Sequence, residues 1–315
     1  MAHSVFIDGD VGTTGLQIKA RLEQRDDINL LGLDEAHRKD RVRRGEMLNA
    51  CDLAILCLPD DAAREAVGMI ENPAVKVIDA STAHRIGEGW TYGFPEYGPG
   101  QYEKIRAATR VTNPGCYAIS SVAILHPLVG AGVLPADGAV TINAVSGYSG
   151  GGKQLIAAFE DQDGGDDAET PFFAYGLNLR HKHVPEITQW SGLAHAPLFV
   201  PSVGHYHQGM IVQVPLALWS IAGRPTAADI HGALSAHYNG ARFVTVAPLA
   251  ETAAMARLEP EILNGTNELR LHVFANEDHE QAVVMALIDN LGKGASGQAV
   301  QNMNIMLGVD EGEGL

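Results

Sequence analysis

Cys116 has the sequence context of a catalytic nucleophile. It follows Asn113-Pro114-Gly115, where proline and glycine end a strand-like run, and it precedes an apolar segment of helical period, Ala118 to Val129. The sequence therefore places Cys116 in the first turn of a helix, where the helix dipole and unpaired N–H groups favour the thiolate, the reactive species in acyl transfer. Cys51 and Cys57 belong to another apolar run and are predicted to be core residues.

Two H-x-H pairs form the second chemical motif. The first, His181-Lys182-His183, precedes Pro185, which can start a helix and so leaves both histidines on the loop before it. A histidine there can act as acid and base, and Glu186 can orient the substrate or the imidazole. The second pair is His205-Tyr206-His207. Joining the pairs around a metal would call for a cysteine or carboxylate ligand that the motif does not offer, so no metal site is predicted.

A glycine-rich corner follows the first strand-like run. Gly9, Gly12 and Gly15 are spaced G-x-x-G-x-x-G rather than in the commoner G-x-G-x-x-G, and an ordinary glycine-rich turn is the alternative interpretation. The position between a strand and a helix favours nucleotide binding, because the turn brings amide groups and a helix N-terminus against a pyrophosphate. We expect the cofactor to contact these glycines together with Thr13 and Thr14.

The residues for the 2′ end of the cofactor leave two interpretations open. Asp34, at the end of the second strand-like run, would bind a ribose 2′-OH and favour NAD. The basic residues from Arg38 to Arg44 follow at once, and one of them could hold a 2′-phosphate, although a solvated helix face explains most of them.

A second glycine-rich corner, 146–153, follows the strand-like run 140–145. Its amides and Lys153 could hold an anionic group or an oxyanion, or the corner could be a flexible turn.

The first hundred residues predict the element order that would position these corners. Short, mostly continuous apolar runs at 5–7, 28–33, 53–58 and 75–78 alternate with segments of helical period. Strands covered on both faces and alternating with helices indicate a parallel, doubly wound α/β sheet. Later alternating runs at 210–216 and 268–273 suit an antiparallel sheet with one face covered.

Composition limits the classes of protein. A length of 315 residues suggests about two domains, and a net charge of −16 argues against nucleic acid as a partner. Three cysteines form no disulfide framework, so a reducing compartment is expected. The N-terminal residues show no signal-peptide pattern and no apolar run approaches a membrane span, which predicts a cytoplasmic protein without membrane partners.

Together the motifs resemble the N-acetyl-gamma-glutamyl-phosphate reductases, relatives of aspartate-semialdehyde dehydrogenase. The resemblance covers essentially the whole chain and is closest to the shorter members of the family. It rests on segments 9–15, 81–85, 113–117, 146–153, 181–187 and 293–304.

The resemblance implies a reaction and a set of site residues. N-acetyl-glutamyl 5-phosphate would be reduced by NADPH to the semialdehyde through a Cys116 thioester, with His181, or else His183, as acid/base. Arg38 and Ser81 would complete the cofactor site. Arg85, Asn113, Ser149, Gly150 and Glu186 would bind the acyl phosphate. The segment Ser81-Thr82-Ala83-His84-Arg85 differs from the S-x-D-F-R of longer members.

The resemblance also implies the architecture. Residues 1–114 would form the dinucleotide domain, completed by a C-terminal segment, 293–315, whose helix lies near 295–307. Residues 115–292 would form an α+β catalytic and oligomerisation domain of a homo-oligomer, dimer or tetramer. The acidic stretch 160–167 is predicted to be a surface loop. Aspartate-semialdehyde dehydrogenase is the nearest alternative function, and a non-catalytic dinucleotide sensor is a second.

Overall fold

A computed structural model describes residues 2–160 and 168–315 and divides the chain into two compact units. Unit 1 comprises residues 1–95, 99–115 and 295–315, and unit 2 comprises residues 96–98 and 116–294. The chain thus enters unit 2 at Glu96, returns to it at Cys116 and leaves it after Gly294.

Unit 1 is built on a six-stranded sheet in the order β2-β1-β3-β4-β6-β5, in which every paired strand is parallel. The predicted parallel sheet is therefore confirmed. The strands are β1 (His3–Asp8), β2 (Ile28–Leu31), β3 (Leu53–Leu56), β4 (Lys76–Asp79), β5 (Thr91–Tyr92) and β6 (Arg110–Thr112). The helices are α1 (Thr13–Leu22), α2 (Arg41–Ala50), α3 (Asp60–Gly68), α4 (Gln101–Ala107) and α10 (Gly297–Leu307).

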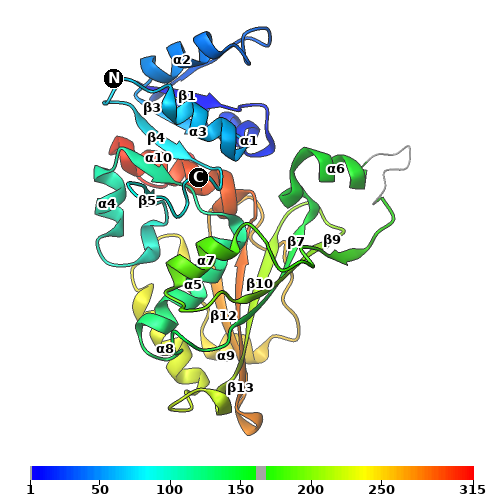
Figure 1. The fold of residues 1–315 in the computed structure, drawn as a ribbon. Helices are drawn as coiled ribbons and strands as arrows, with labels where there is room; N and C mark the ends of the chain where they lie inside the picture. The colour runs from blue at the N-terminus through cyan, green and yellow to red at the C-terminus, as the bar shows by residue number, and fades with distance from the viewer. Residues whose placement is uncertain (1, 161–167) are drawn as a thin grey trace. The chain divides into compact units, whose positions relative to one another are not determined.

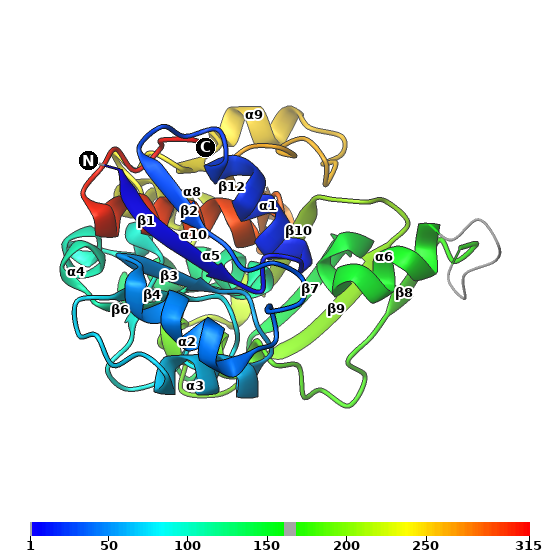
Figure 2. The same cartoon turned by 90° about the horizontal axis from the view of Figure 1, so that it is seen from above.

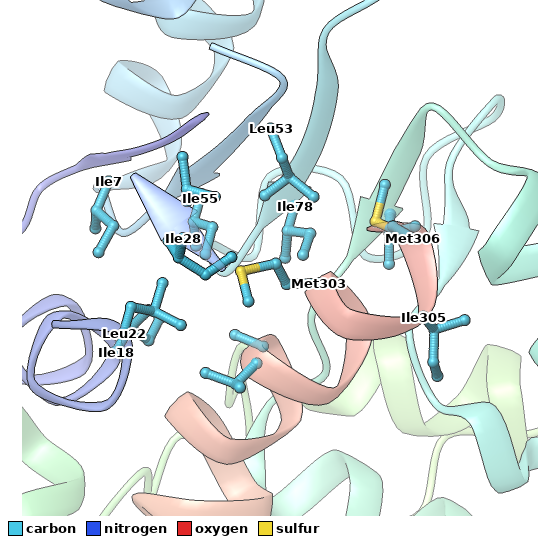
Figure 3. Packing of buried hydrophobic residues seen from close by; sticks show 14 of the residues in the cluster. Ile7, Ile18, Leu22, Ile28, Leu53, Ile55, Ile78, Met303, Ile305 and Met306 are labelled. Carbon is cyan, nitrogen blue, oxygen red and sulfur yellow. The ribbon is translucent and has the colours of Figure 1, made fainter. Parts of the chain in front are cut away.

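Alternate residues of the central strands build two hydrophobic cores, one on each face of this sheet. Ile7 and Ile55 pack with α1 and α10, whereas Phe6 and Ala54 pack with α2 and α3. Figure 2 shows α2 and α3 on one side of the sheet and α1 and α10 on the other. Figure 3 shows the core beneath α10, where Met303 lies among isoleucines of β1, β3 and β4. Because both faces are covered, the strands consist of continuous apolar residues rather than alternating ones.

The C-terminal helix completes unit 1 and is confirmed close to its predicted bounds. It ends at Leu307 because Gly308 adopts a left-handed conformation, φ 77°, which stops a helix. The chain beyond it is held by Arg25, whose Nη1 donates to Asn304 Oδ1 at 2.6 Å and to the carbonyl of Glu313 at 3.1 Å. A segment far away in the sequence therefore contributes both core residues and hydrogen bonds to unit 1.

Unit 2 contains a seven-stranded sheet in the order β11-β12-β13-β10-β7-β9-β8. The predicted antiparallel pairing holds for β10 and β12, which both pair with β13, but the sheet as a whole is mixed, since β7–β9 and β11–β12 are parallel. The strands are β7 (Thr141–Gly147), β8 (Phe172–Ala174), β9 (Leu198–Gly204), β10 (Met210–Ala217), β11 (Val244–Val246), β12 (Leu269–Asn276) and β13 (Gln281–Ile288). The helices are α5 (Cys116–Gly130), α6 (Gly152–Glu160), α7 (Val184–Ser191), α8 (Ala227–His237) and α9 (Leu249–Ala254).

The two faces of this sheet differ in their burial. On the inner face, Val212, Val214 and Val284 are fully buried on strands that α5 contacts (Figure 1). The opposite face carries residues that are half-buried or exposed, which we call the outer face: Leu198, Val200, Gln213, Pro215, Phe274 and Val283. Val283 lies between Pro215 and Phe274 in the strand register, so these side chains adjoin one another. The named residues are the part of this side that unit 2 leaves half-buried or exposed, whereas Ile211 and Leu287 on the same side are buried against Leu263.

None of the helices in residues 2–160 and 168–315 has the length and apolar composition of a membrane-spanning segment.

Cys51 is confirmed as a core residue, and burial raises the pKa of its thiol to about 11. Cys57 is half-buried and packs against the core shared with α1. Of the acidic stretch 160–167, Glu160 ends α6 and accepts a hydrogen bond from the Tyr148 hydroxyl at 2.9 Å, whereas 161–167 lie outside the described residues.

Candidate active site

The glycine corner after β1 is a turn that other residues could not form. Gly9 has φ 95°, and a Cβ there would lie 2.3 Å from the carbonyl oxygen of Cys57. A Cβ at Gly15 would lie 2.3 Å from the carbonyl oxygen of Gly9. Gly12 is the N-cap of α1 and provides no capping side chain, so Thr13 and Thr14 present the backbone of the first helical turn. The corner forms a cradle that brings these N–H groups close to an anionic ligand.

Arg38 lies at the mouth of this cradle, and Asp34 does not. Arg38 lines a pocket at the carboxyl ends of β1 and β2 together with Gly9, Asp10 and Gly32, and its Nε lies 3.6 Å from Asp10 Oδ1. The Asp34 side chain is exposed and accepts hydrogen bonds from the backbone N–H and Nδ1 of His37, and both bonds lower its pKa, the backbone bond more than the side-chain bond. Of the two candidates, the pocket therefore contains the cation.

Ser81 and Arg85 follow β4 and are buried within unit 1. Both the N–H and the hydroxyl of Ser81 donate to Asp79, at 2.9 and 2.8 Å. Arg85 donates from Nε to the carbonyl oxygen of Asn113 and from Nη2 to that of Ala80, each at 3.1 Å. These contacts hold the ends of β4 and β6 in a fixed arrangement.

The Asn113 amide is held on both sides. Its Nδ2 donates to the carbonyl of Ala295 at 3.0 Å, and its Oδ1 accepts from Asn302 Nδ2 at 3.1 Å. The residues that precede the cysteine corner in sequence are therefore fixed by the C-terminal segment.

Cys116 is the first residue of α5, as predicted, and its side chain is partly exposed. No acidic residue lies in the first turn of this helix, so the positive end of the helix dipole is not offset there. The backbone of Gly294 packs behind it, since a Cβ at that glycine would lie 2.9 Å from the Cys116 Cβ.

Tyr117, the next residue, brings both predicted histidines into the same cluster. The ring of Tyr117 lies 5.8 Å from the rings of His181 and His183, which are 4.8 Å apart. Tyr175, which the sequence did not suggest, donates to the Tyr117 hydroxyl at 3.3 Å and lies 3.5 Å from His181 Nε2. Burial is the main cause that raises the pKa of Tyr175 to about 12; the hydrogen bond with Tyr117 lowers this pKa and the charge of Cys116 raises it, so the phenol remains protonated beside Cys116.

The hydrogen bonds of His181 assign its tautomer. The backbone N–H of His183 donates to His181 Nδ1 at 3.2 Å, so in the neutral ring the proton belongs on Nε2. His183 is itself the N-cap of α7, and Glu186 is buried in the first turn of that helix. The histidine loop and the helix after it therefore occur as the sequence predicts.

The second glycine corner has a buried serine and an exposed glycine. The Ser149 N–H donates to the His207 carbonyl at 3.0 Å, and the Ser149 hydroxyl accepts from Asn290 Nδ2 at 3.1 Å. Gly150 is exposed, and a Cβ there would lie 2.9 Å from Ser146 Oγ. The corner is thus a fixed 3-10 turn, Tyr148–Gly151, rather than a flexible one.

The second histidine pair stands apart from this cluster. His205 and His207 are exposed between β9 and β10, with ring centroids 6.3 and 5.5 Å from that of Tyr148. Within the part of the chain that the structure describes, no three histidine, cysteine or carboxylate side chains are grouped so that they could hold a metal ion.

Comparison with known proteins connects this arrangement to a family. Residues 11–105 match the semialdehyde dehydrogenase NAD binding domain, and residues 116–290 match the semialdehyde dehydrogenase dimerisation domain. Among solved structures, aspartate semialdehyde dehydrogenase II from Vibrio cholerae, complexed with ASA, has a TM-score of 0.71 at 15% identity, covering 98% of each chain. The NADP complex of the Candida albicans aspartate semialdehyde dehydrogenase has a TM-score of 0.66 at 13% identity, covering 97% of this chain and 99% of that one. These structures show the same fold.

Sequence relatives are more specific. An N-acetyl-gamma-glutamyl-phosphate reductase from Burkholderia cenocepacia is 56% identical over 306 residues, which is 97% of each chain. Proteins called N-acetyl-gamma-glutamyl-phosphate reductase 2 from Pseudomonas putida and Nostoc sp. are 55% and 51% identical, each covering at least 98% of both chains. The resemblance inferred from the motifs is thereby confirmed, and this chain belongs to the N-acetyl-gamma-glutamyl-phosphate reductase family.

Proposed function

We propose that this chain reduces N-acetyl-L-glutamyl 5-phosphate to N-acetyl-L-glutamate 5-semialdehyde and phosphate, a step of arginine biosynthesis. The observation that carries the proposal is the cluster at the start of α5, where Cys116 is followed by a tyrosine that contacts both His181 and His183. A nucleophile and an acid/base group in one cluster are what acyl transfer through a thioester requires.

The chemistry begins with the thiolate of Cys116, which attacks the acyl phosphate carbonyl. The carbon–sulfur bond forms, the bond to the phosphate oxygen breaks, and phosphate leaves with the electron pair. NADPH, when bound, supplies the hydride that converts this thioester into a thiohemiacetal. The thiohemiacetal oxyanion then re-forms the carbonyl, and the carbon–sulfur bond breaks to release the semialdehyde and the thiolate.

His181 is the group best suited to serve the reacting oxygen. With Nδ1 accepting a backbone N–H, its Nε2–H is the donor of the ring, and Tyr175 stands 3.5 Å from that nitrogen. A donor placed where negative charge develops on the carbonyl oxygen lowers the barrier to attack and to reduction. We assign the acid/base role to His181 and regard His183 as the alternative.

The cofactor site is proposed on the first glycine corner. Gly9 and Gly15 leave a cradle that a Cβ would fill, which supports a pyrophosphate against Gly12, Thr13 and Thr14. Arg38 would hold the 2′-phosphate of NADP from the adjoining pocket. Ser81 would support the cofactor from the end of β4.

The substrate is proposed to contact the second glycine corner, the first turn of α7 and the residues that precede Cys116. Gly150 presents an exposed backbone to a ligand, and Ser149 and Glu186 would support it from buried positions. Arg85 and Asn113 make hydrogen bonds that hold the backbone before Cys116, so any substrate contact would add to that positioning role.

The oligomer is proposed to form through unit 2. A matched dimerisation domain spans residues 116–290, and the outer face of the sheet leaves apolar side chains uncovered. A second copy of the chain, as a dimer or within a tetramer, would bury this face.

Replacement of Cys116 by serine tests the nucleophile. Because an alkoxide cannot replace the thiolate at neutral pH, we expect semialdehyde oxidation with NADP and phosphate to fall by about 10³-fold or more. NADP affinity, measured by titration, should stay within about twofold, since the residue forms no part of the proposed cofactor cradle. Cys51→Ala is the matched control and should retain turnover.

Wild-type turnover in Cys116→Ser would refute the assignment of Cys116 as the nucleophile. Faster oxidation of aspartate semialdehyde by the wild type would favour aspartate-semialdehyde dehydrogenase as the function. A wild type that binds NADP but oxidises neither semialdehyde would favour the non-catalytic sensor.

Replacement of His181 by asparagine tests the acid/base assignment. We expect kcat to fall by about 10²- to 10⁴-fold and one limb of the pH–rate profile to disappear. His195→Asn changes an exposed histidine elsewhere in unit 2 and should leave both unchanged. If His181→Asn keeps a near-normal kcat while His183→Asn loses it, the proton is moved by His183.

Replacement of Arg38 by methionine tests the cofactor site. Loss of a charged partner of the 2′-phosphate should raise the KM for NADP by about tenfold or more. The KM for NAD, which lacks that phosphate, should change little. Arg41→Met, at an exposed position paired with Glu65, is the control. Equal losses with both cofactors, or a wild-type kcat/KM that is higher with NAD, would contradict the assignment.

A charge on the outer face tests the oligomer. Val283→Glu would place a carboxylate in the proposed interface and should shift the protein toward the monomer in sedimentation velocity, because burying an unpaired charge costs several kcal/mol. Val42→Glu adds the same charge at an exposed position of α2 and should change nothing. A monomeric wild type would rule out the proposed assembly.

A further inference from the structure

Lys293 is a fully buried cation in unit 2, with 0% of its side chain exposed. Its Nζ lies 2.9 and 3.1 Å from the two carboxylate oxygens of Glu96, which is itself nearly buried, and 5.4 Å from the ring centroid of Phe243. Removing two charges from water carries a desolvation penalty that their attraction roughly repays, so a buried pair is weak evidence of added stability. The pair therefore calls for a reason other than stability.

The backbone next to Lys293 supplies that reason. Residues Gly292–Ser296 form a π-helical turn, in which the Gly294 N–H donates to the carbonyl of Asp289, five residues earlier, at 2.9 Å. Such turns are rare and often occur at functional sites. A Cβ at Gly294 would lie 2.9 Å from the Cβ and 3.5 Å from the Cα of Cys116. The turn that carries Lys293 thus packs directly behind the nucleophile.

The same residues lie where the chain enters and leaves unit 2. Glu96 begins the first stretch of the unit, Cys116 begins the second and Gly294 ends it. At each of these three residues the chain continues into unit 1 on one side. Contacts through space within unit 2 must therefore fix the positions of these residues. The ion pair connects the first stretch to the last, and Gly294 connects the last to Cys116.

We propose that the Lys293–Glu96 ion pair is a positioning device for Cys116, which fixes the turn at Gly294 and thereby holds the thiol in place for attack. This inference rests on the proposed function, because it takes Cys116 as the nucleophile. Lys293 and Glu96 are positioning residues, since they act through the backbone of Gly294 and not on the substrate.

The test compares Lys293→Met with the double variant Lys293→Met/Glu96→Gln. The single variant leaves an uncompensated buried carboxylate and should lower both Tm and kcat. The double variant buries no charge and should recover Tm, because a buried pair replaced by neutral groups is often no less stable. Since the tether is still missing, its kcat should remain about tenfold to a hundredfold below wild type, with the KM for the semialdehyde within about twofold.

Alkylation of Cys116 by iodoacetamide supplies a readout that needs no substrate. Its rate should fall in the double variant along with kcat. Arg257→Met, which removes an exposed ion pair with Glu259, should leave Tm, kcat and the alkylation rate unchanged. A double variant that recovers kcat and alkylation together with Tm would overturn the proposal, because the pair would then act only on stability.

Gly294→Ala tests the last link without changing any charge. The added methyl group should displace Cys116 and reduce kcat by at least the same factor, whereas NADP binding should persist. Gly68→Ala is the control, since a Cβ there meets nothing within 4 Å. Wild-type kcat in Gly294→Ala would also overturn the proposal. A wild type that oxidises no semialdehyde would instead refute the proposed function.

Discussion

The close approach of Gly294 to Cys116 is the constraint on which the site depends. A Cβ at Gly294 would lie 2.9 Å from the Cys116 Cβ, which leaves no space for even a methyl group, so the π-helical turn at 292–296 must keep a fixed path. That path is set by the Asp289 carbonyl on one side and by the Lys293–Glu96 pair on the other. A reactive thiol at a helix N-terminus is useful only if its position is fixed, because misplacement of reacting atoms by about 1 Å costs about 10²-fold in rate.

Unit 1 applies the same principle to the segment before the cysteine. The carbonyl of Asn113 is held by Arg85, and the Asn113 amide by Asn302 and the Ala295 carbonyl. Asn302 is fully buried and also donates to the carbonyl of Gly93, so one side chain of α10 connects two loops at the carboxyl edge of the sheet. The C-terminal segment therefore has two roles, since it completes the core beneath the sheet and fixes the chain that leads to Cys116.

Local signals in the sequence were sufficient for much of the fold and for part of the site. The apolar runs, the glycine spacing and the Asn113-Pro114-Gly115 corner depend on near neighbours, and the parallel sheet and the start of α5 at Cys116 were predicted from them. Tyr175 and the pairing of Lys293 with Glu96 depend on contacts between distant segments, for which no periodicity exists. The mixed sheet escaped prediction for the same reason, because alternation in a single strand does not reveal the direction of its neighbour.

The net charge of −16 still has to be reconciled with two anionic ligands. Some of the basic residues near the first corner are already paired, since Arg44 binds the buried Asp8 in bidentate fashion and Lys19 pairs with Asp10. Backbone dipoles offer the remaining positive potential. The helices that begin at the three predicted ligand corners, α1, α5 and α6, have no acidic residue in their first turn, a property they share with α2 and α10, whereas α3, α4, α7, α8 and α9 each have one or more. Acidic residues are thus absent from the N-termini where an anion must approach, and this local pattern allows an acidic protein to bind anionic ligands.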